Sequence, residues 1–136
     1  MRYLLDTSVW YRAVVGVETI PPETREILTA ANERFGLSAI SLWEIGKKVQ
    51  IGKLRLNRRV SDWLEWAVGS QIEVLAIDVK VVADAMNLPG FPNRDPADEL
   101  IVATARMHEL TLLTTDRALR NYRHARIQYF KPLAEA

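Results

Sequence analysis

The chain opens with Tyr3-Leu4-Leu5-Asp6-Thr7-Ser8, and this stretch indicates the class of fold. Consecutive apolar residues are typical of a short strand that is buried on both faces. Asp, Thr and Ser favour the start of a helix, because their side-chain oxygens accept hydrogen bonds from the free N–H groups of its first turn. The segment therefore predicts a buried strand that passes directly into a helix, with Asp6 at the carboxyl end of the strand.

The same alternation continues along the chain. Short apolar segments predict further strands at 36–40, 72–77, 111–114 and 127–130. Helical spacing and helix-start residues predict helices at 23–34, 41–52 and 60–69, from Asp78, from Asp95 to Leu110, and briefly from Asp116. Strands that alternate with helices indicate an α/β fold, with a mostly parallel central sheet covered on both faces. We expect one domain over residues 1–136.

Composition limits the chemistry. The 136 residues include no cysteine and only two histidines, His108 and His124. These counts exclude a disulfide scaffold, thiolate metal sites and a cysteine nucleophile, and they leave too few ligands for a histidine-rich centre. Any metal must be held by oxygen, which favours Mg²⁺ or Mn²⁺. No apolar run approaches the ~20 residues that span a bilayer, so we expect a cytoplasmic protein without membrane contact.

The net charge of +1 conceals two basic runs. The first comprises Lys47, Lys48, Lys53, Arg55, Arg58 and Arg59, with no acid between them. The second comprises Arg117, Arg120, Arg123, Arg126 and Lys131. Such runs suit contact with a nucleic-acid backbone, although a solvated helix face explains them equally well.

Four acids stand at expected strand ends or helix starts: Asp6, Glu44, Asp98 and Asp116. In a parallel sheet these positions meet at one rim, where carboxylates repel one another unless a cation neutralises them. Divalent metals held by oxygen activate water for attack on phosphodiesters. The pattern therefore points to a metal-dependent hydrolytic site.

Each acid also has a purely structural interpretation. Ser41-x-x-Glu44 matches a capping box, and Asp95 with Pro96 matches a helix start that places Asp98 in its first turn. Asp6 and Asp116 fit helix caps as well. Asp78 fits only that description, and we assign it to capping alone.

The motifs resemble those of a known family. Tyr3-Leu4-Leu5-Asp6-Thr7-Ser8-Val9 resembles the opening of PIN domains, and Ser41-Leu42-Trp43-Glu44-Ile45 their second acidic motif. The stretch from Asp95 to Ala105 is similar to the third motif, and Leu113-Thr114-Thr115-Asp116 to the fourth. Their order and spacing cover essentially the whole chain and resemble VapC, the toxin of type II toxin–antitoxin pairs.

The resemblance implies a PIN-like α/β/α sandwich and a Mg²⁺- or Mn²⁺-dependent endoribonuclease. Its metal-binding and catalytic residues would be Asp6, Glu44, Asp98 and Asp116. Four further residues would lie next to these acids and help to orient them: Thr7, Ser8, Thr114 and Asp95. One departure is Glu99, which stands where these toxins commonly have arginine.

The resemblance also implies partners: an RNA substrate, a cognate antitoxin whose tail blocks the acidic groove, and a toxin homodimer within that complex. The helix at 23–35 and the segment around Trp43 are candidate surfaces for the antitoxin. Lys47 and Lys48 are candidate RNA contacts, because they follow Glu44 by three and four residues and share its side of the helix. Most of the four tryptophans are expected in the core or an interface.

Two alternatives belong to other functional classes. A phosphoacceptor signalling domain would need adjacent acids after the first strand and a lysine after a late strand, whereas this chain has the single Asp6 and Thr114-Thr115-Asp116. A non-catalytic RNA- or protein-binding module on the same fold would use only the basic runs and need not retain four acids.

Overall fold

The computed structural model describes residues 1–136 and is built around a five-stranded sheet. The strands are β1 (Tyr3–Leu5), β2 (Phe35–Ser38), β3 (Ile72–Leu75), β4 (Thr111–Thr114) and β5 (Ile127–Tyr129). Their order is β3-β2-β1-β4-β5, and every neighbouring pair is parallel. The expected mostly parallel sheet is therefore wholly parallel, and β1 lies at its centre.

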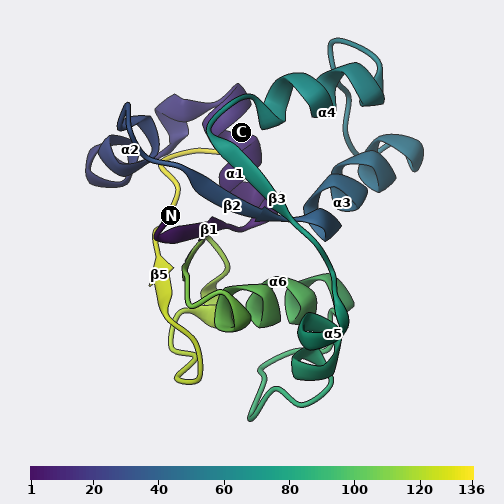
Figure 1. Ribbon diagram of the computed structural model, residues 1–136. Coiled ribbons are helices and arrows are strands. Elements are labelled where there is room, and N and C mark those ends of the chain that lie inside the picture. The colour runs from purple at the N-terminus through teal and green to yellow at the C-terminus, as the bar shows by residue number, and fades with distance from the viewer.

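Helices cover both faces of the sheet. They are α1 (Thr7–Val15), α2 (Pro22–Thr29), α3 (Ala39–Gln50), α4 (Val60–Val68), α5 (Val79–Ala85) and α6 (Pro96–Met107), with short 3₁₀ turns η1 (Val17–Thr19) and η2 (Arg117–Leu119). In Figure 1, α1, α2 and α4 lie above the sheet, and α5 and α6 lie below it. The α/β/α sandwich is thus confirmed.

Side-chain alternation along β1 divides the core in two. Leu5 packs in a cluster that includes Trp10 of α1 and Trp63 of α4. The neighbouring Leu4 packs on the opposite face, against Ile101 and other residues of α6. Successive residues of a strand face opposite sides, so one short apolar strand serves both layers.

Two helices are shorter than the sequence suggests. The expected helix at 23–34 ends at Thr29, because Ala30 is extended and the side chain of Gln71 donates to the backbone oxygens of Ala30 and Glu33. Ala31, expected in the core, is exposed. The helix expected to reach Leu110 ends at Met107, since Glu109 adopts a φ of 55° in the turn before β4.

Strand limits also differ slightly from those expected. The segment at 36–40 contributes β2 only up to Ser38, whose side chain caps α3 by accepting a hydrogen bond from the N–H of Ile40. The strands expected at 72–77 and 127–130 end at Leu75 and Tyr129. Helix propensity and capping at Ser38 therefore start α3 two residues earlier than the Ser41 pattern indicates.

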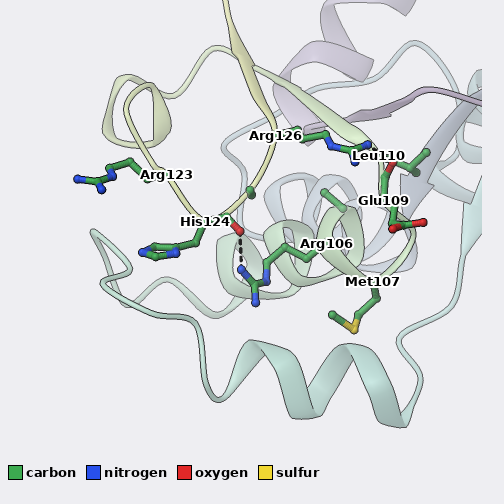
Figure 2. Close-up of a pocket in the computed structure, with 9 residues that line it drawn as sticks. Arg106, Met107, Glu109, Leu110, Arg123, His124 and Arg126 are labelled. Atoms are coloured by element: carbon green, nitrogen blue, oxygen red, sulfur yellow. Dashed lines mark hydrogen bonds between the residues drawn. The ribbon is translucent and has the colours of Figure 1, made fainter.

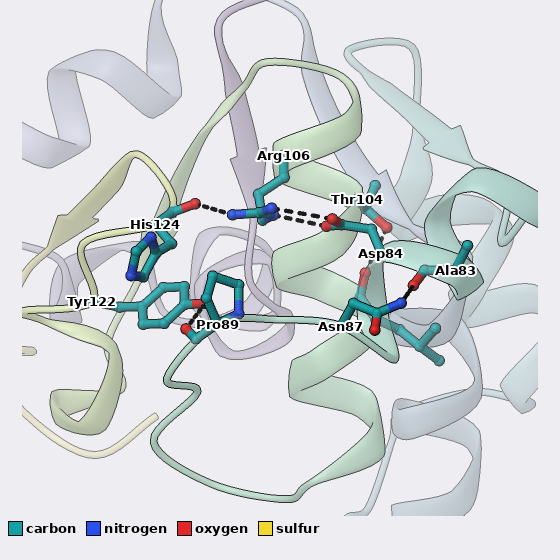
Figure 3. Close-up of polar contacts among 9 residues, drawn as sticks. Ala83, Asp84, Asn87, Pro89, Thr104, Arg106, Tyr122 and His124 are labelled. Atoms are coloured by element: carbon teal, nitrogen blue, oxygen red, sulfur yellow. Dashed lines mark hydrogen bonds and ion pairs between the residues drawn. The ribbon is translucent and has the colours of Figure 1, made fainter.

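An ion pair joins the two helices below the sheet. Arg106 of α6 donates to both oxygens of Asp84 of α5, at 2.7 and 3.1 Å, and also to the backbone oxygen of His124. Tyr122 donates to the backbone oxygen of Pro89 at 2.7 Å (Figure 3). These contacts fasten the loop between α5 and α6 to the segment that precedes β5.

None of the helices combines the length and apolar character that crossing a bilayer requires. Only two of the four tryptophans, Trp10 and Trp63, are buried in the core. Trp43 and Trp66 are 59% and 50% exposed, so neither lies in the core, and their place in an interface stays a prediction.

Gly36 offers a test of the packing around β2. A Cβ added there would lie 3.0–3.2 Å from the side-chain carbons of Leu75, Leu110 and Leu4. We expect Gly36→Ala to lower the free energy of unfolding by about 1–3 kcal/mol through overpacking. Gly46→Ala is the control, because its Cβ would have only one neighbour, at 3.7 Å, within a helix where alanine is favourable. Urea denaturation of both variants measures the difference, and equal stability would contradict the packing argument.

Candidate active site

Asp6 lies at the carboxyl end of the central strand and caps α1. Its Oδ1 accepts a hydrogen bond from the N–H of Thr7 at 2.8 Å, and its Oδ2 accepts one from the hydroxyl of Thr114 at 2.6 Å. Only 8% of Asp6 is exposed. The capping interpretation is therefore correct, and it leaves open a second role for the same carboxylate.

Thr114, the last residue of β4, connects two acids. Its hydroxyl donates to Asp6 and accepts from the N–H of Asp116 at 3.0 Å. Asp116 in turn caps η2 by accepting from the N–H of Ala118 at 2.9 Å. The parallel pairing of β1 and β4 brings these residues together although they are more than a hundred positions apart.

Glu44 reaches the same edge from α3, but it is not part of a capping box. Because Ser38 caps the helix, Glu44 lies in the second turn, and Ser41 is buried inside the helix. The hydroxyl of Thr7 donates to Glu44 Oε1 and lies 2.8 Å from the Ser41 hydroxyl. Thr7 thus ties α3 to α1 beside Asp6, and the capping-box interpretation of Glu44 is wrong.

Asp98 comes from the start of α6, which is capped by Asp95. Asp95 Oδ1 accepts from the N–H groups of Ala97 and Asp98 at 2.9 and 3.4 Å. Asp98 Oδ2 accepts from the side-chain amide of Asn93 at 3.2 Å, and Asn93 Oδ1 accepts from the N–H of Asp95 at 2.9 Å. Sequence reasoning missed Asn93, because a loop asparagine after proline carries no distinctive signal.

The acids influence one another electrostatically. Burial, with a smaller contribution from the charges of Glu44 and Asp116, raises the pKa of Asp6 to about 6 despite hydrogen bonds from Thr114 and Thr7. Burial also raises the pKa of Asp98 to about 7, with added repulsion from Asp6, Asp95, Asp116 and Glu44. The structure therefore brings all four expected acids to one edge of the sheet.

The donor set matches a hard divalent cation. None of the four acids forms an ion pair with lysine, arginine or histidine, since the three salt bridges of the chain lie elsewhere. Uncompensated carboxylates suit Mg²⁺ or Mn²⁺. No group of three side chains is arranged closely enough to coordinate one ion as it stands. The residues thus fit such an ion in chemistry and charge, and binding would require their carboxylates to draw closer.

The remaining expected site residues lie around this edge in different ways. The hydroxyl of Ser8 is 2.8 Å from that of Thr115. Lys48 helps to line a cavity next to Thr7 and Ser8, whereas the ammonium group of Lys47 donates to Gln50 at 2.7 Å. Glu99 is partly buried and makes no side-chain ion pair.

Another cavity, of about 430 Å³, lies at the opposite end of the sheet. Its lining includes Arg106, Arg123 and Arg126, from the end of α6 and the segment before β5 (Figure 2). Arg106 is held by Asp84, and Arg126 donates to the backbone oxygen of Glu109. Arg123 and Arg126 of the second basic run therefore lie at the opposite end of the sheet from the four acids.

Comparison with known proteins defines the class. Residues 3–125 match the PIN domain family. The chain is 32% identical to Ribonuclease VapC22 of Mycobacterium tuberculosis over 123 residues, which cover 90% of this chain and 93% of that protein. This protein therefore belongs to the PIN-domain family, within its VapC ribonuclease group.

Solved structures agree on the fold. A chain from the crystal structure of DNA-bound VapBC from Salmonella typhimurium superimposes with a TM-score of 0.70 at 20% identity, covering 95% of this chain and 98% of that one. A chain from DNA-bound VapBC2 of Rickettsia felis gives a TM-score of 0.69 at 19% identity, with the same coverage.

The raised pKa values predict how stability depends on pH. Because the pKa values of Asp6 and Asp98 are about 6 and 7 in the folded chain, against an ordinary 3.8, the folded state binds protons more tightly than the unfolded state. Their contribution to stability is full below pH 4 and is lost as the pH rises through 6 and 7. In EDTA, we expect Asp98→Asn to gain stability relative to the original chain as the pH increases from 5 to 8. Denaturant titrations along this range measure the difference, and parallel curves would contradict it.

Proposed function

We propose that this protein is a Mg²⁺- or Mn²⁺-dependent endoribonuclease, acting through a single domain over residues 1–136 as the toxin of a toxin–antitoxin pair. The observation that carries the proposal is the gathering of four acids without a cationic side chain, two of them with raised pKa values. Four carboxylates at one edge are costly for a folded protein. A divalent cation offsets that cost.

In this proposal Asp6, Glu44, Asp98 and Asp116 hold the ion. When bound, a divalent ion would supply activated water and stabilisation of negative charge on a phosphate. Thr114 fixes Asp6 by donating to it, and Thr7 fixes Glu44 in the same way. Asn93 orients Asp98, and Asp95 holds the turn that presents it. Ser8 supports the edge through Thr115.

The two histidines take no part in this proposal. His108 lies at the end of α6, and His124 is exposed near the opposite end of the sheet. Proton transfer is therefore assigned to water and the carboxylates, which agrees with metal-assisted hydrolysis.

The proposed partners are RNA, a cognate antitoxin protein, and a second toxin copy within that complex. Support comes from the 32% identity to a VapC ribonuclease and from neighbours described as toxin–antitoxin complexes, including one from Klebsiella pneumoniae. We propose Lys48 and Lys47 as contacts for the RNA backbone, since both follow Glu44 on α3. Exposed Trp43 and helix α2 remain the proposed surfaces for the antitoxin.

The first test is RNA cleavage by the purified chain freed of any antitoxin. We expect Mn²⁺ or Mg²⁺ to support cleavage of mixed cellular RNA and EDTA to abolish it. Asp98→Asn should lower the rate by more than about 100-fold, and Thr114→Val by about 10–100-fold, because it removes a group that orients Asp6. Asp78→Asn, which alters a helix cap away from the acids, should cleave normally. Cleavage that survives both EDTA and Asp98→Asn would overturn the proposal.

Ion binding can be tested separately from cleavage. At pH 7.5 we expect Mn²⁺ to raise the melting temperature, because an ion bound only by the folded state stabilises it by about 2.7 kcal/mol at 100 times its Kd. The shift should disappear in Asp98→Asn and persist in Asp78→Asn. Equal shifts in the two variants would show that the ion binds elsewhere.

A further inference from the structure

A groove runs away from the acidic edge along one face of α1. It consists of two adjoining cavities of about 330 and 340 Å³, and Tyr11 lines both. The first cavity begins at Thr7 and Ser8, directly after Asp6. The second reaches Val14 and Val15 at the other end of the helix. These α1 positions are three or four residues apart and so share a face, over a length of about 13 Å.

Three members of the first basic run line the groove opposite α1. Lys48 and Lys53 line the first cavity, and Arg55 lines the second. None of these three cations forms an ion pair. Only one acid, Glu135, lines either cavity. Cations therefore outnumber acids in the lining of the groove.

Aromatic rings lie at the far end of the groove. Trp66 lines the second cavity with half of its surface exposed, and its ring packs edge-on against the buried Trp63. The guanidinium of Arg58 lies over the Trp66 ring, 4.3 Å from its centroid. Cations that alternate with exposed aromatic rings form the usual surface for single-stranded nucleic acid, because phosphates meet the cations and bases stack on the rings.

We propose that this groove binds the single-stranded RNA that flanks the cleaved bond, with phosphates at Lys48 and Lys53 and an unpaired base on Trp66. The inference rests on the proposed ribonuclease function and adds a path for the strand. The four acids lie beyond the end of the groove that begins at Thr7 and Ser8, so a strand cut there needs an adjoining surface of opposite charge. Lys48, Lys53 and Trp66 supply that surface without being part of the acidic edge.

Charge is the first variable to test. The probe is a fluorescein-labelled oligouridylate of about 12 nucleotides, within the usual length for such surfaces, bound to the full chain in EDTA. Its integrity is checked on a gel after each titration. Removing two phosphate contacts with Lys48→Ala/Lys53→Ala should weaken binding and flatten the plot of log affinity against log salt by about 1.4.

A matched control comes from a lysine on another helix. Lys80→Ala removes the same charge, but Lys80 is an exposed residue of α5 that lines neither cavity. It should change the salt dependence less than Lys48→Ala does. Equal effects of the two single variants would show that only general surface charge attracts RNA, and would overturn the groove as the path.

Stacking is the second variable. Trp66→Leu keeps an apolar side chain but removes the aromatic face, and should weaken binding at least about fivefold, while Trp66→Phe should restore much of the affinity. In the original chain the probe should quench tryptophan fluorescence, and Trp66→Phe should lose that part of the quenching. Circular dichroism confirms that each variant remains folded.

The outcomes separate this inference from the proposed function. Specific binding that depends on Lys48, Lys53 and Trp66, without cleavage in Mn²⁺ or Mg²⁺, would support the groove and refute the nuclease proposal. If neither cleavage nor RNA binding changes in these variants, the groove is refuted as the RNA path and the nuclease proposal is unaffected. If the variants bind RNA normally but no longer retain a co-purified antitoxin, the groove is a protein-docking surface. That result also overturns the inference.

Discussion

The arrangement of the acidic edge depends on one buried carboxylate. Asp6 accepts hydrogen bonds from the first N–H of α1 and from Thr114 of β4, so it joins the central strand, the helix that follows it and the neighbouring strand. A buried carboxylate is tolerated only when such donors surround it. Those two bonds lower the pKa of Asp6 without cancelling its rise, because burial is the largest influence and the nearby Glu44 and Asp116 add to it.

That constraint explains why structural and chemical roles coincide here. Asp6, Asp95 and Asp116 each cap a helix or a 3₁₀ turn, and the caps hold the backbone at the carboxyl edge of a parallel sheet. A cap uses one carboxylate oxygen for a backbone N–H and leaves acceptor capacity on the other. The proposed ion site therefore needs no extra scaffold, since the positions that start these elements also bring acids together.

The basic run and the acids become one surface through packing. Residues 47–59 span the end of α3 and its connection to α4, and part of this stretch lies opposite α1 across the groove. Negative charge at one end and positive charge along the wall give the near-neutral chain a polarised face. Such a face suits the proposed RNA strand: one phosphate would lie at the proposed ion site, and the phosphates beside it would meet lysine and arginine.

The sequence by itself determined the local elements: the strand–helix entry at Asp6, the caps at Asp95, Asp116 and Asp78, and the α/β alternation. Hydrophobic spacing and capping are short-range signals, so these features needed no tertiary information. Tertiary structure decided what lies far apart in the chain. It placed Thr114 on Asp6, Thr7 on Glu44 and Asn93 on Asp98, and it left Trp43 and Trp66 exposed while burying Trp10 and Trp63. The physical reason is that strand order and helix packing set these distances and exposures, and no periodic pattern in a single sequence encodes them.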